Sequence, residues 1–210
     1  MSHPIFARIY ARTSVSEARH QDPYRRELLA GLSGRVLEVG CGNGMNFGLY
    51  PPEVSEVVGV EPEDYLFRQA RLAAATSARR IVVVRGRAEM VSQLVSGPFD
   101  AAVFSLVLCS VPDPKTVLRE TKKVLADGAS VRFYEHVLSD DPKLARYQRL
   151  FAPAWSRAAG GCRPDRDTLS VVENEFSISD VRAFDFCPGC RFPRGIVAPH
   201  VLARGVFQPI

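Results

Sequence analysis

The sequence predicts an α/β fold built on a mainly parallel central sheet flanked by helices, and two observations carry this prediction. Short apolar segments rich in β-branched residues alternate with segments in which apolar residues recur at helical spacing. Strands separated by helix-length segments form βαβ units, whose right-handed crossovers bring the carboxyl ends of the parallel strands to one edge of the sheet. Ligands bind at that edge, so the residues that follow each strand are the candidates for a site.

The opening segment, residues 5–32, is expected to form one or two helices, because Leu28, Leu29 and Leu32 lie about one helical turn apart. Gly34 interrupts this pattern, and residues 35–39 then form a short apolar strand. We expect residues 1–32 to act as a helical cap or lid and residues 33–210 to hold the ligand, within one structural domain overall.

The middle of the chain alternates strand and helix. Four short apolar runs are expected to be strands: residues 57–60, 81–84, 100–108 and 131–137. The segments between them carry apolar residues on one helical face and are expected to be helices: residues 65–75, 90–95 and 114–125. Beyond Ser139 the pattern favours a helix over residues 142–151 and strands over residues 178–186 and 200–206.

Composition and charge exclude several classes of protein. With 210 residues, 46% of them hydrophobic and 24% charged, the chain suits one globular domain. Its net charge of +4 is mild and its arginines are spread along the whole sequence, so no nucleic-acid partner is expected. The longest apolar run, residues 101–109, is about half the ~20 residues that a membrane-spanning helix needs, and the N-terminus lacks a signal-peptide pattern. We therefore expect a cytoplasmic protein without stable membrane insertion, and a homodimer is compatible with the sequence.

A glycine-rich turn follows the first strand at residues 38–44, Glu-Val-Gly-Cys-Gly-Asn-Gly, and a helical segment is expected after it. Glycines let the backbone turn sharply and approach a ligand closely. A dinucleotide fingerprint is excluded, because its third glycine would fall on Met45 or Phe47. No Gly-Lys-Ser/Thr sequence follows to form a phosphate-binding loop. The turn therefore favours a ligand without phosphates.

Two acidic residues accompany this turn. Glu38 precedes the first glycine by two positions, and Glu61 ends the next strand, 19 residues after Gly42, close to the ~20 expected of a carboxylate that binds ribose hydroxyls. An adenosyl sulfonium with an amino-acid tail is cationic at its sulfur and at its α-amine, so carboxylates attract it and would repel a pyrophosphate. The alternative is that Glu61 is a solvated acid at the end of a strand.

From Arg35 to Val137 the chain resembles the class I S-adenosylmethionine-dependent methyltransferases, which implies a Rossmann-like fold, S-adenosylmethionine as cofactor and S-adenosylhomocysteine as product. The resemblance implies that the glycines wrap the methionine and ribose, that Glu61 binds the ribose, and that the segment after the third strand binds the adenine. The cofactor-binding residues implied in this way are Glu38, Gly40, Cys41, Gly42, Gly44, Asn46, Glu61, Pro62, Ala88, Glu89, Ser105, Leu106 and Val107. The chain departs from the family at Arg87, where many relatives carry an acid, and at residues 127–129, Asp-Gly-Ala, where Pro-Gly-Gly is usual.

Further stretches narrow the resemblance to the methyltransferase-like family that includes alkyl thiol S-methyltransferases. They are residues 106–111 (Leu-Val-Leu-Cys-Ser-Val), residues 134–137 (Tyr-Glu-His-Val), Gln148, residues 153–155 (Pro-Ala-Trp), Gly161-Cys162 and Pro199-His200. Together they extend the similarity over residues 35–207. Membrane-associated members carry an N-terminal hydrophobic anchor that this chain lacks, so membrane attachment is not expected.

These features predict an enzyme that transfers a methyl group to a small-molecule acceptor such as a thiol or a hydroxyl. A thiol suits the reaction, because with a reference pKa near ~8.5 a few per cent of it is thiolate at neutral pH. The alternatives are quinone-type carbon methylation and a non-catalytic protein that binds S-adenosylmethionine or S-adenosylhomocysteine. A nucleic-acid methyltransferase is disfavoured, since residues 105–108, Ser-Leu-Val-Leu, occupy the place of its Asn/Asp-Pro-Pro-Tyr/Phe motif.

His136, just past the carboxyl end of a strand, is the candidate general base, with Glu135 as a partner that orients it. The alternative is that His136 caps the strand through hydrogen bonds or shapes the substrate site. Tyr10, Tyr24 and Trp155 are candidates for the wall of the acceptor pocket, or else for the hydrophobic core.

The five cysteines predict neither a disulfide framework nor a metal centre. Their number is odd and their spacing irregular, which suits a reducing compartment. The segment Cys187-Pro-Gly-Cys190 has the spacing of a metal knuckle, but no second pair completes a set of four ligands, and Pro-Gly favours a turn. Cys41 suits its place between two glycines by its small size, and Cys109 is expected to end a buried strand.

Overall fold

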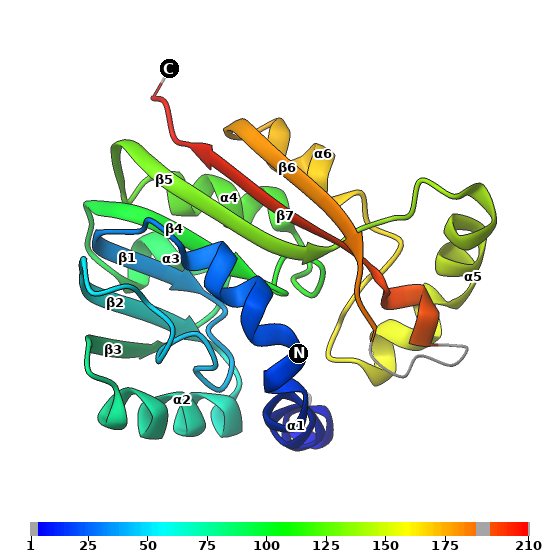
Figure 1. Cartoon of the computed structure of the whole chain (residues 1–210), viewed down its shortest axis with the longest axis horizontal. Coiled ribbons are helices and arrows are strands. Elements are labelled where there is room, and N and C mark those ends of the chain that lie inside the picture. Colours follow the sequence, from blue (N-terminus) through cyan, green and yellow to red (C-terminus); the bar gives the residue numbers. More distant parts are fainter. Residues whose placement is uncertain (1–3, 188–193, 210) are drawn as a thin grey trace.

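A seven-stranded sheet forms the centre of the computed structural model, which describes residues 4–187 and 194–209 (Figure 1). Its strands are β1 (Gly34–Val39), β2 (Val54–Glu61), β3 (Arg80–Arg85), β4 (Phe99–Ser105), β5 (Leu125–His136), β6 (Ser177–Asp185) and β7 (Pro199–Val206). Their order across the sheet is β3-β2-β1-β4-β5-β7-β6. Strands β1 to β5 pair in parallel, whereas β7 pairs antiparallel with both β5 and β6. The α/β fold with a mainly parallel sheet is therefore confirmed.

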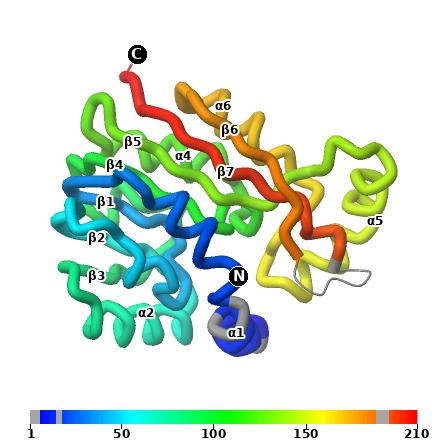
Figure 2. Tube along the Cα trace, viewed as in Figure 1, coloured from blue at the N-terminus to red at the C-terminus, as the bar shows by residue number. Residues whose placement is uncertain are grey.

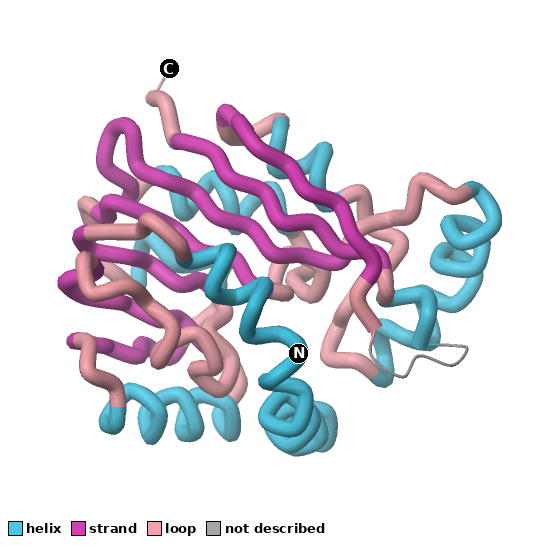
Figure 3. Tube along the Cα trace, viewed as in Figure 1, coloured by secondary structure: helices cyan, strands magenta, loops and turns pink. Residues whose placement is uncertain are grey.

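Helices cover both faces of this sheet (Figure 3). They are α1 (Pro4–Leu29), α2 (Asp64–Thr76), α3 (Val91–Leu94), α4 (Pro114–Lys122), α5 (Pro142–Ala158) and α6 (Thr168–Glu173), together with the 3₁₀ turns η1 (Ala88–Met90) and η2 (Arg194–Val197). Leu28 of α1 and Ala70 of α2 pack in one layer of the core, whereas Val91 of α3, Val117 of α4 and Val172 of α6 pack in the other. Helix α5 lies beside the sheet, beyond the carboxyl end of β5 (Figure 1).

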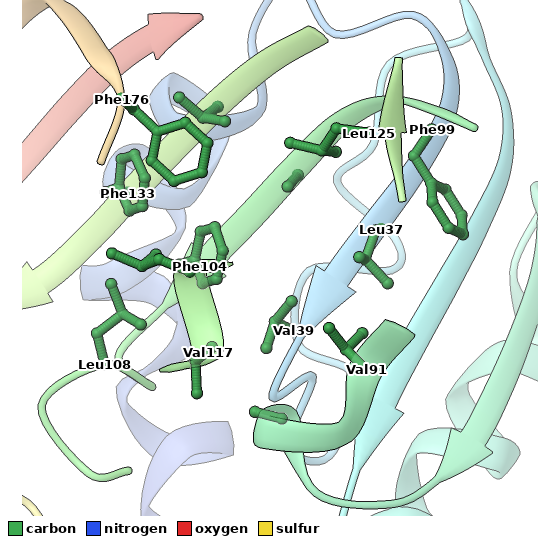
Figure 4. Packing of buried hydrophobic residues seen from close by; sticks show 14 of the residues in the cluster. Leu37, Val39, Val91, Phe99, Phe104, Leu108, Val117, Leu125, Phe133 and Phe176 are labelled. Carbon is green, nitrogen blue, oxygen red and sulfur yellow. The ribbon is translucent and has the colours of Figure 1, made fainter. Parts of the chain in front are cut away.

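The two core layers follow from the alternation of side chains along each strand. In β4, Ala101 and Val103 belong to the layer with α1 and α2, whereas Ala102 and Phe104 belong to the layer with α3, α4 and α6. Figure 4 shows the second layer, in which the rings of Phe104 and Phe133 stack with their centroids 5.0 Å apart. Strands that are buried on both faces are apolar throughout, which is why the sequence shows continuous apolar runs at the central strands.

Helix α1 reaches from the core of the sheet to the edge where the parallel strands end. Pro23 lies inside this helix, and a proline within a helix removes one backbone hydrogen bond and bends the axis. Figure 2 shows that the helix changes direction between its first part and the part that runs along the sheet. The segment expected to form one or two helices is therefore one bent helix, anchored by the buried side chains of Leu28 and Leu29.

Two expectations for the first half of the sheet were wrong. Residues 40–53 form turns in place of the helix expected after the glycine turn; Pro51 and Pro52 lack the backbone N–H groups that a helix would use. Strand β4 ends at Ser105 instead of residue 108, because Leu106 turns the chain with a φ of +57°.

The segment after α4 also differs from the sequence-based prediction. Helix α4 ends at Lys122, and Leu125 already belongs to β5. Gly128, with a φ of +76°, bends the chain within β5, where the pairing with β4 passes from the pair Phe99 and Leu125 to the pair Ala101 and Ser130. The unusual Asp-Gly-Ala segment therefore lies inside the strand as a bend and not as a separate turn.

The C-terminal part is more regular than its sequence indicates. Helix α5 continues beyond residue 151 to Ala158, and α6 was not expected. The amide of Gln148 fixes α5 in place: its Nε2 donates to the carbonyls of Val137 and Ile196 at 3.0 and 2.9 Å. The turn expected at Cys187–Cys190 extends into residues 188–193, outside the described residues. None of the helices described is both long and apolar enough to span a bilayer.

Candidate active site

A cavity of about 640 Å³ opens where β1, β2, β4 and β5 end. Most of the residues selected from the sequence line it: Gly40, Gly42, Glu61, Pro62, Ala88, Glu89, Ser105, Leu106, Val107 and His136. Helix α1 adds Phe6 and Tyr10 to the wall, and α5 adds Trp155. The other selected residues are buried outside this lining: Glu38, Cys41, Gly44 and Asn46.

The glycine turn uses backbone conformations that larger residues avoid. Gly40 and Gly42 have φ values of +70° and +57°, in the left-handed region. A Cβ atom at Gly40 would lie 2.3 Å from Cγ2 of Val107, so this glycine lets the turn after β1 pack against the loop after β4. A Cβ atom at Gly42 would lie 3.6 Å from the ring of Tyr10, which lies across the cavity in α1.

Glu61 ends β2 and holds the glycine turn in place. Its Oε2 accepts a hydrogen bond from the N–H of Gly42 at 3.0 Å, and its Oε1 accepts one from the N–H of Glu63 at 2.9 Å. Burial raises the pKa of Glu61 to about 7, although these hydrogen bonds act to lower it. Because the residue is only 5% exposed, the alternative of a solvated acid is wrong.

Glu38 lies in a buried polar network that the sequence does not reveal. Its carboxylate accepts hydrogen bonds from Nδ2 of Asn46 at 2.7 Å and from the hydroxyl of Tyr50 at 2.8 Å. Arg25 of α1 donates to Oδ1 of Asn46 at 2.9 Å and to the hydroxyl of Ser105 at 3.2 Å. Burial raises the pKa of Glu38 to about 7. The network therefore ties α1 to the ends of β1 and β4.

In the segment after β3, a guanidinium nitrogen of Arg87 lies 3.2 Å from a carboxylate oxygen of Glu89, and Ala88 between these two residues is buried. The basic residue that departs from the family pattern is thus accompanied by an acid two positions later, and both line the cavity.

The loop after β4 is shaped by a carboxylate from the neighbouring strand. Leu106 adopts a left-handed conformation that is unusual for leucine. The N–H groups of residues 107–109 then donate to the carboxylate of Glu135 at 2.9, 2.9 and 3.2 Å. Glu135 was expected to orient His136, but its oxygens hold this loop, and it acts on the imidazole through its charge. Cys109 belongs to the loop and does not end a strand.

His136 ends β5 and meets two thiols from distant segments. The Sγ atoms of Cys109 and Cys162 lie 3.5 and 3.6 Å from its Nδ1. Hydrogen bonding with Cys109 and the nearby imidazole lowers the pKa of Cys162. Burial acts to lower the pKa of His136, but Cys162 and Glu135 outweigh it and raise this pKa. The ring of His200 lies 4.4 Å from that of His136, and burial lowers its pKa to about 3, so it is neutral.

The aromatic candidates divide between the cavity and the core. Tyr10 and Trp155 line the cavity. Tyr24 stacks on Phe184 of β6, with the ring centroids 4.4 Å apart and 5° between the ring planes. Core packing is therefore the role of Tyr24, because this part of α1 lies against the sheet.

Comparison with known proteins agrees with this geometry. A family model described as a methyltransferase domain matches residues 37–133. Human thiol S-methyltransferase TMT1B is 33% identical over 214 residues, which cover 96% of this chain and 85% of that protein. The chain belongs to this methyltransferase family. The methyltransferase is also 34% identical over 175 residues to human thiol S-methyltransferase TMT1A, covering 80% of the chain and 70% of that relative.

A solved structure shares the fold of the methyltransferase. N-methyltransferase NodS from Bradyrhizobium japonicum, in complex with S-adenosylhomocysteine, has a TM-score of 0.64 and 18% sequence identity, and the match covers 91% of this chain and 86% of that one. At this identity the likeness shows the Rossmann-like fold. Membership of the family makes the protein an enzyme that uses S-adenosylmethionine to methylate a small-molecule acceptor.

Proposed function

We propose that this methyltransferase methylates small thiols. The observation that carries the proposal is the presence, in one cavity, of the glycine turn and of the cluster formed by Cys109, His136 and Cys162. Because the strand order is β2-β1-β4-β5, the turn after β1 and the cluster at the end of β5 lie at separate places along the same edge. The glycine turn after β1 suits the methyl donor, and the cluster at the end of β5 suits the acceptor. The relatives TMT1A and TMT1B are named thiol S-methyltransferases, which supports the same acceptor class.

The donor lies over β1 and β2 in this proposal. Glu61 accepts hydrogen bonds from the ribose hydroxyls, and Gly42 leaves room for the methionine part of the donor. The adenine lies against Ala88 and Glu89 at one end of the cavity, and Leu106 borders the transferred methyl group. The other selected residues complete the donor site. Four of them line the cavity, Gly40, Pro62, Ser105 and Val107, and four are buried behind its wall, Glu38, Cys41, Gly44 and Asn46.

The reaction is an in-line displacement at the methyl carbon. The acceptor thiol loses its proton, its sulfur forms a bond to the methyl carbon, and the bond from that carbon to the sulfonium breaks. The positive sulfonium and the negative thiolate both become neutral thioethers, so a site that excludes water favours the transition state. Alignment of the two sulfur atoms supplies much of the acceleration.

We further propose that residues 1–32 cap this cavity. Phe6 and Tyr10 of α1 lie in its wall, and Arg25 joins the same helix to the network behind the donor site. The first part of α1 therefore excludes water from the reacting groups, while the part beyond Pro23 remains packed on the sheet.

Donor affinity is expected to fall as the pH decreases below about 7. The pKa of Glu61 in the unliganded enzyme is about 7, and only the ionised carboxylate attracts the cationic donor, so each pH unit lower weakens binding by up to about tenfold. Glu61→Gln is expected to weaken binding about 10-fold or more above this pH and to reduce the pH dependence, leaving the part that belongs to Glu38, whose pKa is also about 7. Isothermal titration calorimetry with S-adenosylmethionine measures both effects. The exposed Glu53→Gln substitution is the control, and a pH dependence that persists unchanged in Glu61→Gln would contradict this assignment.

The acceptor class is tested with the purified enzyme and a donor that carries a labelled methyl group. We expect label in the thioether products of small apolar thiols, and much less with matched alcohols, amines and quinols. The product is identified by mass spectrometry, so that methylation on sulfur, oxygen, nitrogen or carbon is distinguished. Label found only on carbon would instead establish quinone-type methylation and remove the thiol proposal.

The predicted cytoplasmic location, homodimer and absence of a nucleic-acid partner remain proposals. Cell fractionation, light scattering of the purified protein and a binding assay with duplex DNA and RNA measure them in turn.

A further inference from the structure

Three side chains from separate segments converge in the wall of the cavity. Cys109 comes from the loop after β4, His136 from the end of β5 and Cys162 from the segment after α5. Their Sγ and imidazole nitrogen atoms all lie within 4.8 Å of one another. All three residues line the cavity, and both cysteines are free and buried.

The two sulfur–nitrogen distances in this cluster match those of a tetrahedral metal site, and the two sulfur atoms lie within 4.8 Å of each other. Zinc binds thiolate sulfur at about 2.3 Å and imidazole nitrogen at about 2.0–2.1 Å, which places sulfur and nitrogen about 3.6 Å apart on adjacent corners of a tetrahedron. The Sγ atoms of Cys109 and Cys162 lie 3.5 and 3.6 Å from Nδ1 of His136. The side chains therefore need little movement to hold one ion between them.

Hydrogen bonds alone account for this arrangement less well. An imidazole nitrogen has either one proton or one lone pair in the ring plane, so Nδ1 makes one good hydrogen bond and two sulfur atoms compete for it. The thiol of Cys109 also lies 3.5 Å from the hydroxyl of Ser110, but this contact leaves the competition at Nδ1 in place. A cation between the three atoms satisfies all of them. Two thiolates also balance the charge of a divalent ion, so the occupied cluster places no net charge in this buried region.

The backbone that carries the cysteines is held in position. The N–H of Cys109 donates to the carboxylate of Glu135 at 3.2 Å, and its carbonyl accepts from the N–H of Arg163 at 2.8 Å. The second bond joins the loop after β4 directly to the residue that follows Cys162. Ligands fixed by such outer contacts bind metal more tightly than mobile ones.

We propose that Cys109, His136 and Cys162 bind one zinc ion whose fourth position is open to the cavity. Two thiolates and one imidazole are donors that zinc prefers, and three protein ligands with one open position are typical of catalytic zinc sites, whereas structural sites have four protein ligands. The sequence predicted no metal site, because Cys109, His136 and Cys162 are far apart in the chain and their spacing matches no metal-binding motif.

The role of the ion rests on the proposed thiol methylation. The acceptor thiol binds at the open position and releases its proton to solvent, because coordination to zinc deprotonates a thiol. The zinc-bound sulfur then attacks the methyl carbon, the bond from this carbon to the sulfonium breaks, and S-adenosylhomocysteine is formed. The methylated product is a neutral thioether, a weaker ligand than the thiolate, so it dissociates and the site is free again.

The test uses cobalt, which occupies zinc sites and reports their geometry by its absorption. Reduced, chelator-treated protein is titrated with Co²⁺, and we expect one equivalent to give the intense visible bands of tetrahedral cobalt together with a thiolate charge-transfer band. Zinc added afterwards is expected to displace the cobalt. Cys109→Ala, Cys162→Ala and His136→Ala are each expected to weaken cobalt binding at least about 100-fold while the affinity for S-adenosylmethionine is kept, which shows that the variants are folded.

Matched controls remove a cysteine and a histidine elsewhere. Cys41→Ala, at the glycine turn, and His20→Ala, exposed on α1, are expected to bind cobalt as the wild type does. A wild-type protein without the tetrahedral spectrum, or a spectrum that persists in Cys162→Ala, overturns the zinc site. If the protein binds metal but methylates no thiol, the zinc site stands and the proposed function is wrong. If metal-free protein methylates thiols, the proposed function stands and the role of zinc in the reaction is wrong.

Discussion

Gly42→Val is expected to weaken binding of S-adenosylmethionine strongly while the protein remains folded. Gly42 has a φ of +57°, a conformation that costs a branched residue about 1–3 kcal/mol. This conformational cost is small compared with the free energy of unfolding of an ordinary domain, about 5–15 kcal/mol, so the variant remains folded. The added side chain, however, projects between the turn and Tyr10, into the space proposed for the donor. We expect the affinity to fall by at least about 100-fold, or about 2.7 kcal/mol, as measured by calorimetry.

Gly31 provides a control with the same backbone strain. Its φ is +73°, and nothing lies within 4 Å of the place where its Cβ atom would stand. Gly31→Val is therefore expected to lower stability by a similar amount, measured by urea unfolding, without changing donor affinity. Wild-type affinity in Gly42→Val would mean that the donor binds elsewhere.

Removal of the imidazole at position 136 is expected to reduce turnover strongly while donor binding is preserved. Loss of a residue that activates the acceptor costs about 100-fold to 10,000-fold in rate, whether it acts as a general base or holds a metal ion. The donor site is formed by other residues, so calorimetry with S-adenosylmethionine should give an unchanged affinity for His136→Ala. Steady-state kinetics with a thiol acceptor measures the rate.

The exposed His20 of α1 is the control for this substitution, and His20→Ala is expected to keep the wild-type rate. If His136→Ala methylates thiols as fast as the wild type, the residue only caps the strand or shapes the cavity. Reduced affinity for the donor would instead indicate that the substitution disturbs the loop after β4.

The sheet and the cavity wall around the glycine turn could be predicted from the sequence because their signals are local. Each central strand is a largely apolar run, and the glycines lie at a spacing from Glu61, the last residue of the next strand, that the crossover between two parallel strands imposes. The helix wrongly expected after the glycine turn shows the limit of this reasoning. Pro51 and Pro52 were present in the sequence, but the contacts that fix the preceding turns come from elsewhere in the fold.

The acceptor end could not be predicted, because it is assembled from distant segments. Cys109 and Cys162 are separated by α4, β5 and α5, and nothing near either cysteine in the sequence points to the other. The role of Glu135 was missed for a related reason. Its position beside His136 suggested a contact with that residue, but neighbouring side chains on a strand face opposite ways, and its carboxylate serves the loop after β4.

The hydrogen bonds from the N–H groups of residues 107–109 to Glu135 would, in the proposed arrangement, fix the spacing between the donor and the acceptor. Val107 lies in the wall of the proposed donor site, and Cys109 belongs to the cluster with His136 and Cys162. The N–H groups of Val107 and Cys109 both donate to the carboxylate of Glu135. A change at Glu135 would consequently displace one partner relative to the other and slow the encounter between them, even though Glu135 itself touches neither.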